Sequence, residues 1–171
     1  MKQRTNSLLK WLMYAAIAIL FSLIETRLLP AARVQNVSPT FDAALTAAVA
    51  ILEGPAGGAF YGLACGMLRY LAPGNSELIF MLVYMTGGYT VGMLGDYIFS
   101  RSFEAVLLST LLLSTAATAL YTLFMVVMPR RAGLGEAALT GLIEIAMSVF
   151  TVPVVYFPAR AVARRWHSVE E

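Results

Sequence analysis

Gly54-Pro55-Ala56-Gly57-Gly58-Ala59-Phe60-Tyr61-Gly62-Leu63-Ala64-Cys65-Gly66 is the stretch that decides the fold. Gly58, Gly62 and Gly66 stand four residues apart, so on a helix they form one nearly continuous stripe without side chains. In water each glycine would destabilise the helix by roughly 1 kcal/mol relative to alanine. In a bilayer the same stripe lets two helix backbones approach closely and pack. The stretch predicts a close-packing seam inside a membrane, formed with another helix of the chain or with a partner.

Composition supports the membrane interpretation. Of the 171 residues, 59% are hydrophobic and 13% are charged, whereas a soluble domain is about half apolar and a quarter charged. The net charge of +2 and the scattered basic residues argue against a nucleic-acid-binding protein. Cys65 is the single cysteine, which excludes an intramolecular disulfide and leaves the compartment open. We therefore expect an integral membrane protein.

The hydrophobic runs predict an all-α polytopic membrane protein with about six transmembrane helices in a single transmembrane domain, residues 1–171. The predicted segments are 8–28, 41–53, 56–71, 78–95, 105–128 and 137–159, followed by a short basic tail over 160–171. Gly88 and Gly92, four residues apart in the fourth segment, form a second close-packing pair.

One ambiguity concerns residues 41–71. The segment 41–53 is shorter than the ~20 residues that a membrane span requires. It is either a short or tilted helix, or the first half of a re-entrant hairpin whose second half is the glycine helix. Gly54 and Pro55 suit a helix end that is followed at once by a helix start. Both alternatives return the chain to the same side of the membrane.

An even number of segments places both termini on one side of the membrane. With the termini in the cytoplasm, the inner sequences hold seven Lys and Arg residues and the outer loops hold five, counted over the connections between the predicted segments. The positive-inside rule therefore narrowly favours cytoplasmic termini. Arg130 and Arg131, which fall outside in this arrangement, oppose it. We expect a multi-pass protein of the cytoplasmic membrane.

Glu144 is the membrane-buried ionisable residue of the last predicted helix. It lies roughly 10 Å along that helix, deep enough to be costly if it is ionised and unpaired. A relay, a ligand contact or a buried ion pair are the functional interpretations. We favour a lone carboxyl that is hydrogen-bonded to a threonine or tyrosine of a neighbouring helix, because the sequence shows no companion acid or base within the membrane.

Three further residues are given simple structural roles. Glu53, beside Gly54 and Pro55, is predicted to be a solvated turn residue rather than a catalyst. Trp11 and Tyr14 suit the aromatic belt at the membrane interface, at the start of the first helix.

No residue pattern predicts catalysis, so we expect a protein that is not an enzyme. A catalytic triad needs His and Asp, and the one histidine, His167, lies in the polar tail. The sequence contains no phosphate-binding loop, metal-ligand cluster or haem motif, so no catalytic, cofactor-binding or metal site is predicted. Arg160, Arg164 and Arg165 form a basic cytoplasmic tail. We interpret this tail as an interfacial anchor, with a soluble partner or anionic lipid headgroups as the alternative.

Four stretches together resemble the rod shape-determining protein MreD family of bacterial cell-wall elongation, over most of the chain. Thr26-Arg27-Leu28-Leu29-Pro30 is similar to the Ser/Thr-x-Leu-x-Pro ending of the family's first span. Residues 53–68 resemble its small-residue helix, and residues 83–92 its Gly-Tyr-x-x-Gly span. Val152-Pro153-Val154-Val155-Tyr156 resembles its proline-containing last helix. Many members carry an acid soon after the glycine helix, where this chain has Arg69-Tyr70.

This resemblance implies a non-enzymatic scaffold subunit without a cofactor. Its partners would be a bitopic MreC-like membrane protein and, indirectly, an MreB-like filament, a RodA-like polymerase and a class B penicillin-binding protein. The resemblance also implies a six-helix fold like that of the substrate-binding S component of energy-coupling-factor transporters.

Such a vitamin- or metal-capturing S component is the principal alternative function. Those subunits dock through alanines four apart in the first helix, whereas Ala15, Ala16 and Ala18 are not so spaced. Ala43/Ala47 and Ala44/Ala48 have that spacing on the second segment instead. A small unrelated channel or transporter is the third possibility. The scaffold interpretation predicts that the glycine seams build a bundle whose exposed groove binds the single span of a bitopic partner.

Overall fold

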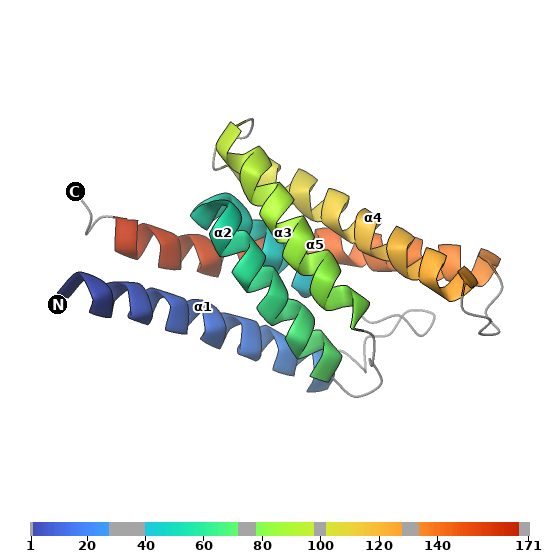
Figure 1. The fold of residues 1–171 in the computed structure, drawn as a ribbon, viewed down its shortest axis with the longest axis horizontal. Coiled ribbons are helices and arrows are strands. Elements are labelled where there is room, and N and C mark those ends of the chain that lie inside the picture. Colours follow the sequence, from blue (N-terminus) through green and yellow to red (C-terminus); the bar gives the residue numbers. More distant parts are fainter. Residues whose placement is uncertain (1, 28–39, 72–77, 98–101, 128–133, 168–171) are drawn as a thin grey trace.

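The computed structural model describes residues 2–27, 40–71, 78–97, 102–127 and 134–167, which form an all-helical bundle (Figure 1). The helices are α1 (Lys2–Arg27), α2 (Asp42–Leu71), α3 (Ile79–Tyr97), α4 (Phe103–Val127) and α5 (Leu134–His167). The predicted all-α fold is confirmed. The predicted segment boundaries lie close to these helices, with three exceptions, at the start of α1, in α2 and at the end of α5.

Helix α2 bends sharply at Gly54 into two arms, residues 42–53 and 55–71. Gly54 has φ 83° and ψ −174°, a backbone conformation that side-chain-bearing residues rarely adopt and glycine reaches freely. Pro55 follows, at the first position of the second arm, where its missing N–H costs no helical hydrogen bond. A Cβ built on Gly58 would lie 2.6 Å from the Cβ of Ala50, and one on Gly62 would lie 3.0 Å from Cγ2 of Thr46. These pairings show that the second arm folds back antiparallel to the first.

The first arm of α2 is the centre of the bundle. Residues 40–52 are all buried, so this arm is covered on every side by the rest of the chain. Its valine and its alanines other than Ala43 belong to the same core cluster as Tyr14 of α1 and Val152 of α5. At 1.5 Å per residue the 12 residues 42–53 extend only about 18 Å, less than the hydrocarbon thickness of a membrane.

Helices α2 and α3 meet along the glycine stripe, backbone against backbone. A Cβ on Gly66 would lie 2.6 Å from Cα of Met81, and one on Gly88 would lie 2.7 Å from the carbonyl carbon of Gly58. A Cβ on Gly62 would overlap the Tyr84 carbonyl, and one on Gly92 would overlap Pro55. The five predicted packing glycines, Gly58, Gly62, Gly66, Gly88 and Gly92, thus come together in one interface within the chain.

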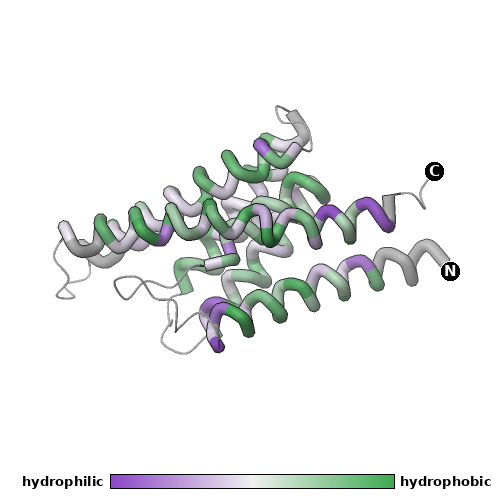
Figure 2. Tube along the Cα trace, turned by 180° about the vertical axis from the view of Figure 1, so that it is seen from behind, coloured by the Kyte–Doolittle hydropathy of each residue, from purple (hydrophilic) through white to green (hydrophobic). Residues whose placement is uncertain are grey.

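Four of the five helices are long and apolar enough to cross a membrane: they contain the stretches Leu8–Arg27, Asp42–Leu71, Phe103–Leu123 and Leu139–Arg165. The apolar part of α3, Ile79–Gly95, is shorter. Figure 2 shows long hydrophobic stretches along the helices and hydrophilic segments gathered toward helix ends, most clearly in the last turns of α5. The protein is therefore a membrane-embedded, multi-pass helical protein.

The start of α1 and the end of α5 lie at the same end of the molecule (Figure 1). The predicted last segment ends at residue 159, whereas α5 continues to His167 through Pro153 and Pro158. Ala159, Val162 and Ala163 are buried, so packing of this stretch against the bundle offsets the cost of proline in a helix.

Candidate functional site

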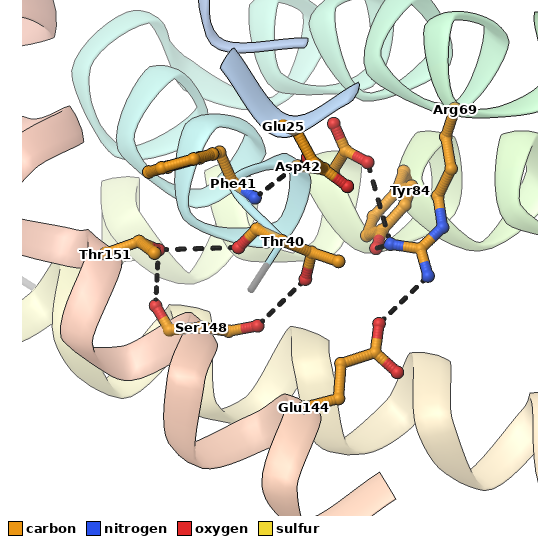
Figure 3. A network of polar contacts seen from close by, with 9 residues as sticks. All are labelled: Glu25, Thr40, Phe41, Asp42, Arg69, Tyr84, Glu144, Ser148 and Thr151. Carbon is orange, nitrogen blue, oxygen red and sulfur yellow. Dashed lines mark hydrogen bonds and ion pairs between the residues drawn. The ribbon is translucent and has the colours of Figure 1, made fainter. Parts of the chain in front are cut away.

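Arg69 is the centre of a charged cluster inside the bundle (Figure 3). It lies in the last turn of α2, and its side chain is 8% exposed. One terminal nitrogen, Nη2, donates to Oε1 of Glu144 at 2.9 Å. The other, Nη1, lies 3.6 Å from Oδ2 of Asp42 and donates to the Tyr84 hydroxyl at 3.4 Å. The guanidinium also stacks 4.2 Å from the centroid of the Phe80 ring, a favourable cation–π position.

Glu25 completes the cluster from α1. Its carboxylate accepts a hydrogen bond from the backbone N–H of Phe41 at 3.4 Å, and Figure 3 places it beside Asp42. The ring of Phe21, one turn earlier on α1, packs 4.9 Å from the ring of Phe41. The cluster therefore joins the end of α1, both ends of α2, the first two turns of α3 and the first half of α5.

Hydroxyl groups continue this network along α5. Oγ of Ser148 lies 3.1 Å from Oγ1 of Thr40. Thr151 donates to the carbonyl of Ser148 at 2.7 Å and is 3.5 Å from the carbonyl of Thr40. These bonds fix the start of α2 against α5, so that Asp42 and Glu144 are held on opposite sides of Arg69.

The interpretation of Glu144 as a lone carboxyl is wrong. Its partner is the guanidinium of Arg69, and Asp42 belongs to the same cluster. Arg69, which follows the glycine stripe near the end of α2, is buried. Replacing one member of such a network would leave an unpaired charge in a low-dielectric interior, which is far more costly than losing an exposed pair.

A second polar contact holds α1 near its start. Glu53 forms an ion pair with Lys10 at 2.5 Å and accepts a hydrogen bond from the Tyr14 hydroxyl at 2.8 Å. The Tyr61 hydroxyl in turn donates to the Tyr14 carbonyl at 3.1 Å. Glu53 is therefore not a solvated turn residue, since its side chain is 10% exposed. Tyr14 is not interfacial either, because it is completely buried.

An apolar groove of about 740 Å³ opens between α1 and the second arm of α2. Its α1 wall includes Ala15 and Ala18, and its α2 wall includes Ala56, Phe60 and Ala64. Phe60 is 73% exposed. The groove lies on the side of the second arm that the glycine stripe does not occupy, so packing against α3 leaves it open.

The basic residues of the predicted tail lie on the last turns of α5. Arg160, Arg164 and Arg165 are exposed, and the guanidinium of Arg160 lies 5.5 Å from the centroid of the Tyr156 ring. They are far along α5 from Glu144 and take no part in the charged cluster.

Sequence reasoning missed three cluster residues, and two of them carry a signal in their spacing. Arg69 follows Gly62 and Gly66 at helical spacing, so it lies on the seam face. Glu25 follows the buried residues Tyr14, Ala18 and Phe21 at intervals of four, three and four residues. A polar residue that continues a buried stripe is predicted to point inward. Asp42 has no such signal, because it begins its helix.

Within the described residues, no three His, Cys, Asp or Glu side chains are grouped so as to hold a metal ion. No protein-family model matches the chain, and a search of curated proteins finds no match. The functional interpretation therefore rests on the groove and on the charged cluster.

Proposed function

We propose that this protein is a non-enzymatic membrane scaffold subunit of the bacterial cell-shape and peptidoglycan elongation machinery. In this role it binds the single transmembrane span of a bitopic, MreC-like partner, and through it an MreB-like filament, a RodA-like polymerase and a class B penicillin-binding protein. The motifs quoted above support the family assignment. The observation that carries the proposal is the apolar groove between α1 and the second arm of α2.

The groove has the properties that a transmembrane helix requires of its receptor. Its walls include the small residues Ala15, Ala18, Ala56, Gly57 and Ala64, and small residues let helix backbones approach closely in a membrane. Large apolar side chains such as Phe60 and Met67 stand beside them and are exposed. In lipid such a surface gains from van der Waals packing against a complementary helix.

The proposal includes six membrane crossings with both termini in the cytoplasm. It counts the two antiparallel arms of α2 as two segments, the first of them short and enclosed by protein. Cys65 is the only cysteine and is buried, so Cys65→Ser gives a background for single-cysteine labelling. Cysteines at positions 6 and 130 are expected to react from the cytoplasmic and external faces, respectively. Labelling of position 130 from the cytoplasm would reject this topology.

A second candidate, an S component of an energy-coupling-factor transporter, is favoured by the charged cluster. Glu25, Asp42, Arg69 and Glu144 place more charge inside the bundle than a scaffold needs, and Thr40, Ser148 and Thr151 add hydroxyl groups. Such groups are typical of the polar contacts that orient a small ligand. Among the described residues these groups pair largely with one another, which favours the scaffold.

Affinity purification from native membranes in mild detergent, with mass spectrometry of the co-purified proteins, tests the two functions. The scaffold predicts a bitopic MreC-like protein together with wall-synthesis enzymes. Recovery of ATPase subunits with a coupling membrane protein would overturn it in favour of the S component. Ala64→Phe, which fills the groove, is expected to lose the bitopic protein, whereas Ala119→Phe on an exposed position of α4 is expected to retain it.

A further inference from the structure

The charged cluster has more acidic than basic groups. Glu25, Asp42 and Glu144 contribute three carboxyl groups, and Arg69 contributes the single guanidinium. Among the described residues, the other titratable side chains that face it are neutral in their ordinary form: Tyr84 of α3, Tyr61 and Cys65 of α2, and Tyr121 of α4, which stacks on Phe80. If all three carboxyl groups were ionised, the cluster would carry two uncompensated negative charges.

The geometry shows which carboxyl groups are compensated. Glu144 takes the shortest ion pair with Arg69, 2.9 Å, and its side chain is 21% exposed. Asp42 is 7% exposed and stands farther from the guanidinium, at 3.6 Å. Glu25 forms no ion pair with the described residues, and its bond comes from a backbone N–H. Because Glu25 and Asp42 repel each other as like charges, this pair is where the excess negative charge concentrates.

A separate observation points to a small species in the site. Nε of Arg69 is buried without a hydrogen-bond partner among the described residues, and so is Oγ1 of Thr46, one turn after Asp42. Buried donors of this kind are normally satisfied, often by an ordered water molecule. A water molecule beside Nε of Arg69 would satisfy this donor within the charged cluster.

We propose that the Glu25–Asp42 pair is a proton-binding site, holding one proton between the two carboxyl groups at neutral pH. Within the described part of the chain, no three His, Cys, Asp or Glu side chains are grouped so as to hold a metal ion. This favours a proton over a metal cation. Glu25 is partly exposed and provides the route by which the proton exchanges. Loss of the proton places two like charges at the junction of α1 and α2 and weakens the attachment of α1. This inference is independent of the proposed scaffold role.

Infrared spectroscopy of the purified full chain tests the proposal, because a protonated carboxyl group has a C=O stretching band that a carboxylate lacks. At pH 7 the wild-type protein is expected to show this band, with a shift in heavy water. Glu25→Gln and Asp42→Asn are each expected to abolish it, since the remaining carboxyl group then ionises and pairs with Arg69. Glu104→Gln, at an exposed position of α4, is the matched control and is expected to keep the band.

Thermal unfolding at several pH values gives a second readout, and its first measurement needs only the wild-type protein. A folded state that holds one more proton than the unfolded state is destabilised as pH rises, and the unfolding constant increases about tenfold per pH unit while that proton is retained. The wild-type protein should show this dependence above pH 7, and Glu25→Gln should lose it. Absence of the infrared band from the wild-type protein, or its persistence in both variants, would overturn the proposal.

Discussion

Helix α2 is held against its two neighbours, α3 and α1, in opposite ways. Against α3 it presents glycines, and the two backbones touch along the stripe from Gly58 to Gly66. Against α1, the first arm of α2 makes polar contacts at both of its ends, Glu53 with Lys10 and Tyr14, and Asp42 beside Glu25. The apolar groove lies between α1 and the second arm. The first interface is closed to any other helix, whereas the second leaves room for one.

The contrast shows how one helix can serve two purposes. Close backbone packing fixes the bundle without using large side chains, so Phe60 and Met67 are free to face outward. Each polar contact between helices contributes only a modest stabilising free energy in a membrane. Because α1 is attached through such contacts, its position is the easiest to change. We expect substitutions on the α3 side to abolish folding, and those on the α1 side to change binding.

Gly62→Leu is expected to have the largest effect. Any Cβ at this position overlaps the carbonyl of Tyr84, and neither backbone can retreat without breaking the interface. Overpacking of this kind costs about 3 kcal/mol or more. Size-exclusion chromatography in detergent should show loss of the monodisperse protein. Gly135→Leu is the control, because a Cβ at Gly135 meets nothing within 4 Å; if both variants behave alike, the seam does not determine folding.

Arg69→Leu is expected to be nearly as severe, at about 3–5 kcal/mol, because it leaves buried carboxylates without their cation. Thermal unfolding followed by circular dichroism measures the loss. The same change at the exposed Arg160 should cost under about 1 kcal/mol. The double variant Arg69→Leu with Asp42→Asn should recover part of the stability, and additive losses would show that the two residues are not coupled.

Tyr14→Phe tests the attachment of α1 to α2, and its expected loss of stability is smaller. It removes the hydrogen bond to Glu53, which is worth about 1.5–3 kcal/mol when the acceptor is charged. Faster hydrogen exchange is expected in α1 and not in α3, since the seam is untouched. Tyr89→Phe, at an exposed position of α3, is the matched control. Equal exchange in α1 of both variants would mean that this contact does not hold the helix.

Ala64→Phe is expected to have the smallest effect on stability, within about 0.5 kcal/mol, because the side chain at this position is exposed and points into open space. It fills the groove, so we expect it to reduce copurification of the bitopic partner while leaving the melting temperature unchanged. Loss of the folded protein would show instead that the groove belongs to the core.

Much of the fold could be predicted from the sequence, because its hydrophobic runs are bounded by polar or turn-forming residues. The hairpin alternative for residues 41–71 was left open, and the antiparallel contacts of Gly58 and Gly62 with Ala50 and Thr46 show two arms that fold back. The predicted last segment ends at residue 159 because Arg160, Arg164 and Arg165 follow it, whereas α5 continues to His167. There, burial of Val162 and Ala163 overrides the local preference.

The charged cluster was harder to predict, since its members are far apart in the sequence. Glu25, Asp42 and Arg69 each lie close to a helix end. Glu25 and Arg69 lie within two residues of their helix ends, where a charge is ordinarily solvated. Only the three-dimensional arrangement brings both ends to Glu144, ten residues inside α5. Charge in a membrane helix is costly enough that a partner should be expected, but the sequence alone does not say which residue it is.

Site-specific photo-crosslinking in native membranes tests the central claim, that the groove between α1 and the second arm of α2 binds a partner span. A photoreactive residue is placed at Ala64 in the groove and, in a matched variant, at Ala119 on α4. The account predicts one strong crosslink from position 64 to a bitopic membrane protein and none to that protein from position 119. Crosslinks to lipid alone at position 64, or to the bitopic protein from position 119 only, would contradict it.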